Sequence, residues 1–208
     1  GSEMCIRDSS YDECMEAIDE CGAPVVSIAG GEPLLHKEMP KIVEGYLARK
    51  KFVILCTNAL LLEKKIDDYK PHPAFTWSIH LDGNEAMHDK SVCQAGVYDK
   101  AVAAIRLAKS KGFRVSINCT LFNDADPQQT ADFFDDMKAI GLDGITVSPG
   151  YAYERAPDQQ HFLNRTKTKE LFRGILSRGR GGKAWPFTQS RMFPVSYTHL
   201  TLPTIYSV

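Results

Sequence analysis

The stretch Pro24-Val25-Val26-Ser27-Ile28-Ala29-Gly30-Gly31-Glu32-Pro33-Leu34 decides the fold of this chain. It opens as a short apolar run with the length and composition of a buried strand. Glycine has no Cβ and tolerates positive φ, so a ligand can approach the backbone at Gly30 and Gly31. Glu32 then places a carboxylate at the carboxyl end of the strand, where α/β proteins bind ligands, and Pro33 removes one backbone N–H. A cationic partner is therefore expected, unless the stretch is only a glycine-rich turn.

The apolar pattern of the remaining sequence switches repeatedly between the helical and the strand period. Stripes spaced by three and four residues alternate about five times with short apolar runs, which is typical of a parallel sheet with crossover helices. Because such crossovers are right-handed, we expect an α/β fold, a full or partial parallel β/α barrel. A doubly wound open sheet is the alternative. The expected strands are 25–28, 52–56, 75–81, 113–122 and 144–148, and the expected helices lie near 11–18, 39–47, 62–69, 101–108, 127–140 and 171–176.

The composition is that of an ordinary globular protein. With 43% hydrophobic and 25% charged residues, a chain of 208 residues can bury a sizeable core. A formal net charge of -1 without long basic tracts gives no support to nucleic-acid binding. No apolar stretch approaches the ~20 residues of a membrane span, and no secretory signal opens the sequence. These features predict a cytoplasmic protein.

Both ends of the chain differ from its body. Residues 1–9 and 195–208 continue neither the helical nor the strand pattern and resemble translated sequencing-adapter read-through. We expect both to be artefactual tails. The body is then predicted to consist of a partial barrel over 10–164 and the start of a truncated carboxyl-terminal region over 165–194.

The six cysteines show no metal-ligand spacing. None stands in a CxxC or CxxxCxxC arrangement, so the sequence predicts no metal site of its own. Scattered thiols with apolar neighbours fit a reducing cytoplasm better than a disulfide framework. Cys14 and Cys21 fall on one face of an expected helix, which predicts that both line the core.

Polar side chains stand at the carboxyl ends of the later expected strands. Cys56-Thr57-Asn58 ends the second strand, Ser78 to Gly83 ends the third, and Asn118-Cys119-Thr120 ends the fourth. Ser148 to Tyr151 is a fifth, weaker candidate. Because the ends of parallel strands converge on one mouth, these groups favour a small-molecule site for an ammonium, a carboxylate and a ribose.

Single members of this set also have plainer interpretations. Asp82 with Gly83 could be a simple turn, His80 a satisfied core histidine, and Cys56 an inert buried thiol. Alternation nevertheless directs Ser78, His80 and Asp82 to one side of their strand. Asn118 lies inside an apolar strand, so its desolvation predicts either a ligand or a polar network around it.

The Gly30-Gly31-Glu32-Pro33 segment, followed by a strand with Ser78 and Asp82-Gly83, resembles the radical S-adenosylmethionine (radical SAM) superfamily. From Tyr11 to Phe193 the chain more closely resembles the adenosylhopane-forming enzymes of hopanoid biosynthesis. The strings that carry this resemblance are Ser27–Pro40, Leu55–Lys65, His80–Gln94 and Val147–Arg165.

The resemblance implies a partial barrel that uses SAM and a 4Fe–4S cluster. In that family the cluster reduces SAM to methionine and a 5′-deoxyadenosyl radical, and the radical adds to the alkene of hopene (diploptene). Quenching of the resulting carbon radical gives adenosylhopane. The implied partners are this lipid, an electron donor such as a flavodoxin or a ferredoxin, and the inner membrane surface.

The resemblance also assigns residue roles. Cys56 is the expected hydrogen-atom donor, because a thiol S–H bond is weak enough for that task. The Gly30 to Pro33 segment is expected to hold the methionine ammonium. The complete predicted SAM-binding set is Gly30, Gly31, Glu32, Pro33, Asn58, Ser78, His80, Asp82 and Asn118.

The sequence departs from the family at the cluster. The family carries a CxxxCxxC loop after its first strand, and both would lie upstream of Ser10. We therefore expect a fragment without the first strand and the cluster ligands, inactive as written. Two alternatives stay open: a SAM-binding or structural α/β module without catalysis, and a radical SAM enzyme acting on another substrate.

Overall fold

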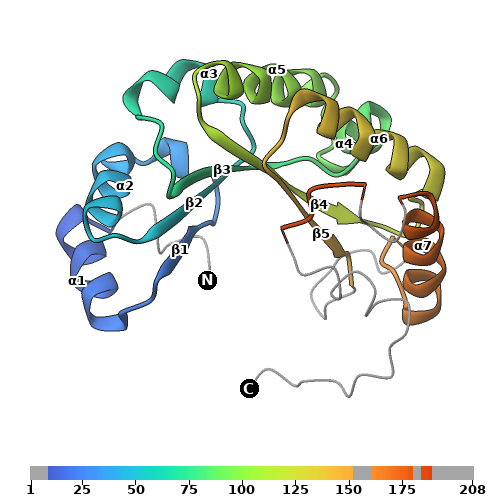
Figure 1. The fold of residues 1–208 in the computed structure, drawn as a ribbon, viewed down its shortest axis with the longest axis horizontal. Helices are drawn as coiled ribbons and strands as arrows, with labels where there is room; N and C mark the ends of the chain where they lie inside the picture. The colour runs from blue at the N-terminus through green and yellow to red at the C-terminus, as the bar shows by residue number, and fades with distance from the viewer. Residues whose placement is uncertain (1–8, 152–160, 180–183, 189–208) are drawn as a thin grey trace.

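The computed structural model describes residues 9–151, 161–179 and 184–188. Five parallel strands form one sheet in the order β1-β2-β3-β4-β5, so spatial order follows chain order and the doubly wound alternative is wrong. The sheet curls into a half-barrel, with strands on the concave side and helices on the convex side (Figure 1). The predicted partial barrel is thus confirmed. The predicted tails, apart from Ser9, lie outside the described residues.

Helices and strands alternate along the chain much as the apolar periods predict. The strands are β1 (Val25–Ile28), β2 (Phe52–Thr57), β3 (Phe75–His80), β4 (Arg114–Leu121) and β5 (Gly144–Pro149). The helices are α1 (Tyr11–Cys21), α2 (Met39–Ala48), α3 (Leu62–Lys65), α4 (Glu85–Ser91), α5 (Val97–Ser110), α6 (Pro127–Ile140) and α7 (Arg165–Arg178), and two short 3-10 helices are η1 (Pro33–Leu35) and η2 (Ile66–Asp68).

Local signals fix the helix ends. Ser10 and Glu13 form a reciprocal capping box at the start of α1. Asp126 caps the first turn of α6 with its side chain, and Pro127 occupies the first helical position. Gly141 ends α6 with a φ of 86°, a left-handed conformation that favours glycine. The two ends of α6 agree with the predicted helix over 127–140, whereas the capping box of α1 was not predicted.

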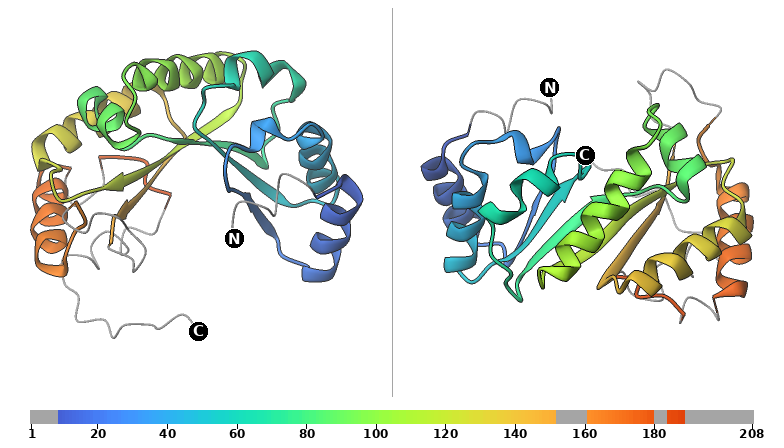
Figure 2. Two further views of the ribbon diagram at one scale, coloured as in Figure 1. Left: turned by 180° about the vertical axis from the view of Figure 1, so that it is seen from behind. Right: turned by 90° about the horizontal axis from the view of Figure 1, so that it is seen from above.

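The helices cover one face of the sheet. Seen from above in Figure 2, α5 lies across the middle of the convex side, with α1 and α2 beyond one edge and α6 and α7 beyond the other. Beneath them, Trp77 packs its ring against those of Phe75, Tyr69 and Phe113. Burial of these large side chains contributes to the hydrophobic stabilisation of the sheet. None of the described helices is long and apolar enough to cross a membrane.

Candidate functional site

A pocket of about 200 Å³ opens at the carboxyl ends of the first four strands. Strand register explains its make-up, because Cys56 pairs with Ser78 and His80 pairs with Asn118, which puts these side chains on one face. We call it the strand-end pocket. Apart from Glu32, Pro33 and Asp82, it contains every predicted site residue. It is lined by Gly30, Gly31, Cys56, Thr57, Asn58, Ser78, His80 and Asn118.

The two glycines leave one wall of this pocket as bare backbone. Gly30 has a φ of 106°, which only glycine adopts without strain. A Cβ placed on Gly31 would meet no atom within 4 Å, so that residue faces open space. Both observations fit a ligand that approaches the main chain closely after β1.

Glu32 ties the ends of β1 and β2 together. Its Oε1 accepts hydrogen bonds from Thr57 Oγ1 at 2.8 Å and from Leu34 N at 3.0 Å, and its Oε2 accepts one from Asn58 N at 2.9 Å. A carboxylate offers about four acceptor positions, so one remains for a cation. Glu32 therefore holds the pocket wall in place before any ligand binds. The sequence analysis did not find Thr57 as a partner of Glu32.

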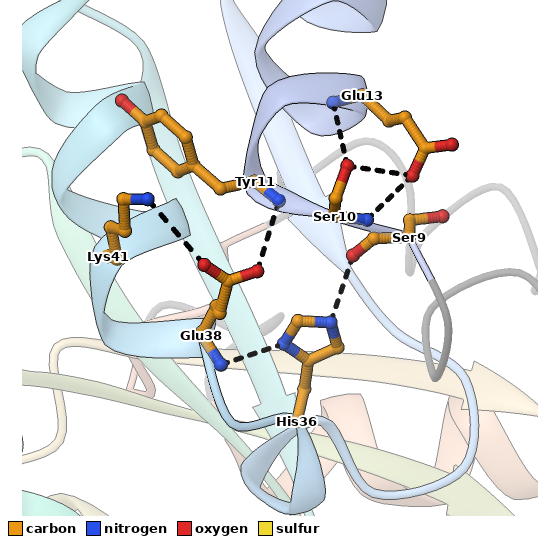
Figure 3. A network of polar contacts seen from close by, with 7 residues as sticks. All are labelled: Ser9, Ser10, Tyr11, Glu13, His36, Glu38 and Lys41. Atoms are coloured by element: carbon orange, nitrogen blue, oxygen red, sulfur yellow. Dashed lines mark hydrogen bonds and ion pairs between the residues drawn. The ribbon is translucent and has the colours of Figure 1, made fainter.

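A second polar network holds the start of α1 beside the loop that follows this turn (Figure 3). Pro33 lies buried at the first position of η1. His36 Nδ1 accepts a hydrogen bond from Glu38 N at 3.1 Å, so Nε2 carries the proton and donates to Ser9 O at 3.0 Å. The carboxylate of Glu38 in turn accepts from Tyr11 N at 3.4 Å. The chain entering α1 is thus anchored to the loop between η1 and α2.

His80 and Asp82 form an ion pair at the rim of the pocket. His80 Nε2 lies 2.8 Å from Asp82 Oδ2, and the Asp82 side chain is only 4% exposed. Thr120 N donates to Asp82 Oδ1 at 2.8 Å, and Ser91 Oγ donates to Oδ2 at 3.0 Å. Asp82 itself lines a neighbouring cavity of about 260 Å³ rather than the strand-end pocket. It acts on that pocket through His80.

The ion pair shifts the pKa of each partner in the direction that favours its charged form. The hydrogen bond to Asp82 raises the pKa of His80 above its ordinary value, against the opposing effect of burial. Burial pushes the pKa of Asp82 upward, but the interactions with His80, Thr120 and Ser91 together hold it below its usual value. His80 thus presents an ionisable side chain to the strand-end pocket.

The short helix α4 supplies two residues that the sequence analysis missed. His88 is buried, and its Nδ1 accepts a hydrogen bond from Asp82 N at 3.2 Å, which fixes the backbone at Asp82. Asp89 accepts from Gly96 N at 2.5 Å and Tyr98 N at 2.8 Å and so anchors the start of α5. Helix α4 is short and shows no apolar stripe. The one local signal for it is Asn84, the cap residue that precedes it.

Two of the predicted ligand groups remain unengaged. Among the described residues, the side chains of Ser78 and Asn118 have no hydrogen-bond partner, so both are available to a ligand. The desolvation argument for Asn118 is wrong, because its side chain is exposed on the concave face. Cys56 Sγ lies 3.8 Å from Ser27 Oγ, which orients the thiol from β1.

The other cysteines do not build a metal centre in the described part of the chain. There, no group of three or more His, Cys, Asp or Glu side chains could hold a metal ion, so these residues do not fit an iron–sulfur cluster. The predicted core position of Cys21 is also wrong. It is the last residue of α1, beyond the buried stripe of Met15 and Ile18, and it is exposed, whereas Cys14 is half-buried.

Family comparison accounts for the glycine turn and the curled sheet. The radical SAM superfamily profile matches residues 5–137, which is more than half of the chain. The chain belongs to the radical SAM superfamily. Enzymes of this superfamily use SAM and a 4Fe–4S cluster, so the predicted cofactors are confirmed at that level. Residues 145–198 match a second family, described as a domain of unknown function (DUF3463).

Similar proteins carry several activities. GTP 3′,8-cyclase of Listeria monocytogenes is 30% identical over 140 residues, 65% of this chain and 42% of that protein. Fe-coproporphyrin III synthase of Methanosarcina barkeri is 23% identical over 119 residues, 55% of this chain and 30% of that protein. This chain thus spans less than half the length of these relatives.

Among solved structures, SuiB of Streptococcus suis bound to S-adenosylmethionine has a TM-score of 0.66 at 15% identity. The match covers 83% of this chain and 39% of SuiB. At this identity the likeness shows the fold alone. Neither SuiB nor the two relatives above is named as a hopanoid enzyme, so the hopanoid assignment stands as a proposal.

Proposed function

We propose that this chain, with its barrel over 10–164, is part of a radical SAM enzyme of hopanoid biosynthesis. The reaction is addition of the 5′-deoxyadenosyl radical to the alkene of hopene, which gives adenosylhopane. The observation that carries the proposal is the presence of Cys56 in the same pocket as the unengaged side chains of Ser78 and Asn118. A hydrogen-atom donor and groups suited to SAM thus share one small space.

SAM fits the donor set of the strand-end pocket. The free acceptor position of Glu32 and the bare backbone at Gly30 suit the methionine ammonium. Ser78 and Asn118 suit the ribose and the carboxylate, and His80 adds the one cationic side chain of the lining. When bound and reduced by one electron, SAM supplies the radical. The chain's own task is to orient it and to present the Cys56 thiol to the carbon radical of the product.

Two exposed apolar side chains follow pocket-lining segments in the chain. Leu35, 59% exposed, lies four residues after Gly31, and Leu60, 37% exposed, lies two residues after Asn58. Hopene as substrate and peripheral contact with the inner membrane enter the proposal through the sequence resemblance. The electron donor in this proposal is a flavodoxin or a ferredoxin.

A second candidate is a radical SAM enzyme with a different small molecule, and the 30% identity to a GTP 3′,8-cyclase favours it. The two candidates separate in one assay. The natural protein that carries this segment, with its cluster reconstituted, is given SAM, a reductant and either hopene or GTP. We expect adenosylhopane by mass spectrometry, whereas a product from GTP alone would overturn the lipid assignment. SAM binding without any product would indicate a module without catalysis.

The role of Cys56 has its own test. In the Cys56→Ala variant we expect SAM cleavage to continue while the saturated product is lost. Cys21→Ala is the matched control, because that thiol is exposed at the end of α1, before β1 begins, and does not line the pocket. An unchanged yield of adenosylhopane from Cys56→Ala would remove the hydrogen-donor role.

A further inference from the structure

The strand-end pocket holds a second reactive group, His80, on the same face of the sheet as Cys56. Cys56 pairs with Ser78 in the ladder, and His80 stands two residues beyond Ser78, so the two side chains are diagonal neighbours. Both line the pocket. A molecule in this small space can therefore meet both side chains.

The orientation of the His80 ring leaves one nitrogen available to the pocket. Nε2 is engaged by Asp82 Oδ2 at 2.8 Å, so Nδ1 is the atom that a group in the pocket can meet. The His80 side chain is 40% exposed and can exchange its proton with water. The neighbouring His88 ring, with its centroid 5.5 Å away, is buried and held by the backbone of Asp82.

We propose that His80 delivers the proton that restores the Cys56 thiol after Cys56 has given up its hydrogen atom. This step rests on the proposed function. Asp82 is a positioning residue in it, because it fixes the ring of His80 without touching the reacting atoms. The carboxylate of Glu32, already engaged by three donors, is not needed for the transfer.

The step balances with one external electron. The carbon radical takes the hydrogen atom of the Cys56 S–H bond, which leaves a thiyl radical on Sγ. A one-electron donor protein of the flavodoxin or ferredoxin class reduces the thiyl to a thiolate. The His80 imidazolium then gives its proton to Sγ, and the neutral imidazole takes a proton from water. The cycle ends with thiol and imidazolium restored.

The electrostatics of the pair support this assignment. The raised pKa of His80 keeps the imidazolium populated at higher pH than an ordinary histidine would. The other ionisable groups around it are Asp82, which favours the proton on His80, and His88, whose own pKa is lowered by burial, which disfavours its charged form. A proton donor is thus present at higher pH than an unpaired histidine would provide one.

The first test needs no turnover. The full chain is alkylated with iodoacetamide from pH 5 to 9, and peptide mass spectrometry follows each cysteine. We expect the Cys56 profile to contain an inflection where His80 titrates, and we expect His80→Gln to abolish it. Cys21 in the same samples is the internal control and should not change. Identical Cys56 profiles in both proteins would overturn the proposed proximity.

The second test uses the cluster-loaded natural protein at saturating SAM, so that weaker SAM binding does not count. In His80→Gln we expect one equivalent of adenosylhopane in a burst, followed by turnover at least about tenfold slower, since general acids contribute roughly 10²–10⁴-fold. Asp82→Asn should slow turnover less and shift its pH profile. Full turnover in His80→Gln overturns the proton role. If the unmodified protein makes no adenosylhopane while Cys56 still senses His80, the proposed function fails instead.

Discussion

Successive side chains of the central strands point alternately to the convex and the concave face of the sheet, and the two sets of side chains differ in polarity. On the convex face, Trp77 and Ile117 are 0% exposed beneath the helices. On the concave face, their chain neighbours Ser78 and Asn118 line the strand-end pocket. Residues that stabilise the fold thus alternate along one backbone with residues that are placed to bind a ligand. Substitutions one residue apart should therefore have opposite consequences, and the following predictions test that separation.

The largest effect is expected on the convex face. Ile117→Ala removes a fully buried side chain and leaves a cavity, which costs about 2–5 kcal/mol of unfolding free energy. Urea denaturation followed by circular dichroism measures this loss. A cost below about 1 kcal/mol would mean that the helices pack loosely on the sheet.

Glu32 contributes both to stability and to the proposed SAM site, so its replacement should lower both the unfolding free energy and the affinity for SAM. Glu32→Ala deletes three hydrogen bonds to a charged acceptor and should lower stability and weaken SAM binding by about 1.5–3 kcal/mol each. Denaturation and isothermal titration calorimetry check the two values. Glu44→Ala is the matched control, since its exposed 3.8 Å ion pair with Lys70 contributes about 0–1 kcal/mol. Unaltered SAM affinity in Glu32→Ala would refute the ligand role.

The His80–Asp82 pair predicts a pH window of stability. Because the pKa of His80 is raised in the folded protein, its contribution is complete below the unfolded value of about 6.5 and is lost as pH rises through the folded value. Because the pKa of Asp82 is lowered, its contribution is present above about 3.9 and is lost as pH falls through the folded value.

The stability difference between the unmodified chain and His80→Gln should therefore be largest between about pH 4 and 6.5. Since His80 is partly exposed, we expect about 1 kcal/mol or less at the maximum. Urea denaturation at a series of pH values gives the difference. A difference independent of pH would show that the pair is not ionised in the folded protein.

The smallest effect on stability is expected on the concave face. Asn118→Ala should change the unfolding free energy by no more than about 0.5 kcal/mol, because its side chain is exposed and unengaged among the described residues. It should nevertheless weaken SAM binding by about 0.5–1.5 kcal/mol, the contribution of one hydrogen bond. Equal stability losses for Asn118→Ala and Ile117→Ala would erase the distinction between the faces.

The sequence predicts the strands, most helices and most of the strand-end pocket, because apolar periods and strand ends are local signals. Besides His80, Asp82 has the partners Ser91 and Thr120, which lie in other elements, and no local sequence pattern indicates such contacts. Helix α4 is too short for a stripe. The apolar neighbours of Asn118 face the helices, whereas Asn118 lies on the open concave face of the sheet. The desolvation that its apolar neighbours predict therefore does not occur.

The proposed SAM site lies at the carboxyl ends of the strands, on the concave face of the sheet. Hydrogen–deuterium exchange of the cluster-loaded natural protein, with and without SAM, tests it most directly. We expect new protection in peptides that contain Gly30–Leu34, Cys56–Leu60, Ser78–Asp82 and Asn118–Leu121, with none confined to α6 or α7. SAM binding that leaves these four segments unprotected would place the SAM site elsewhere.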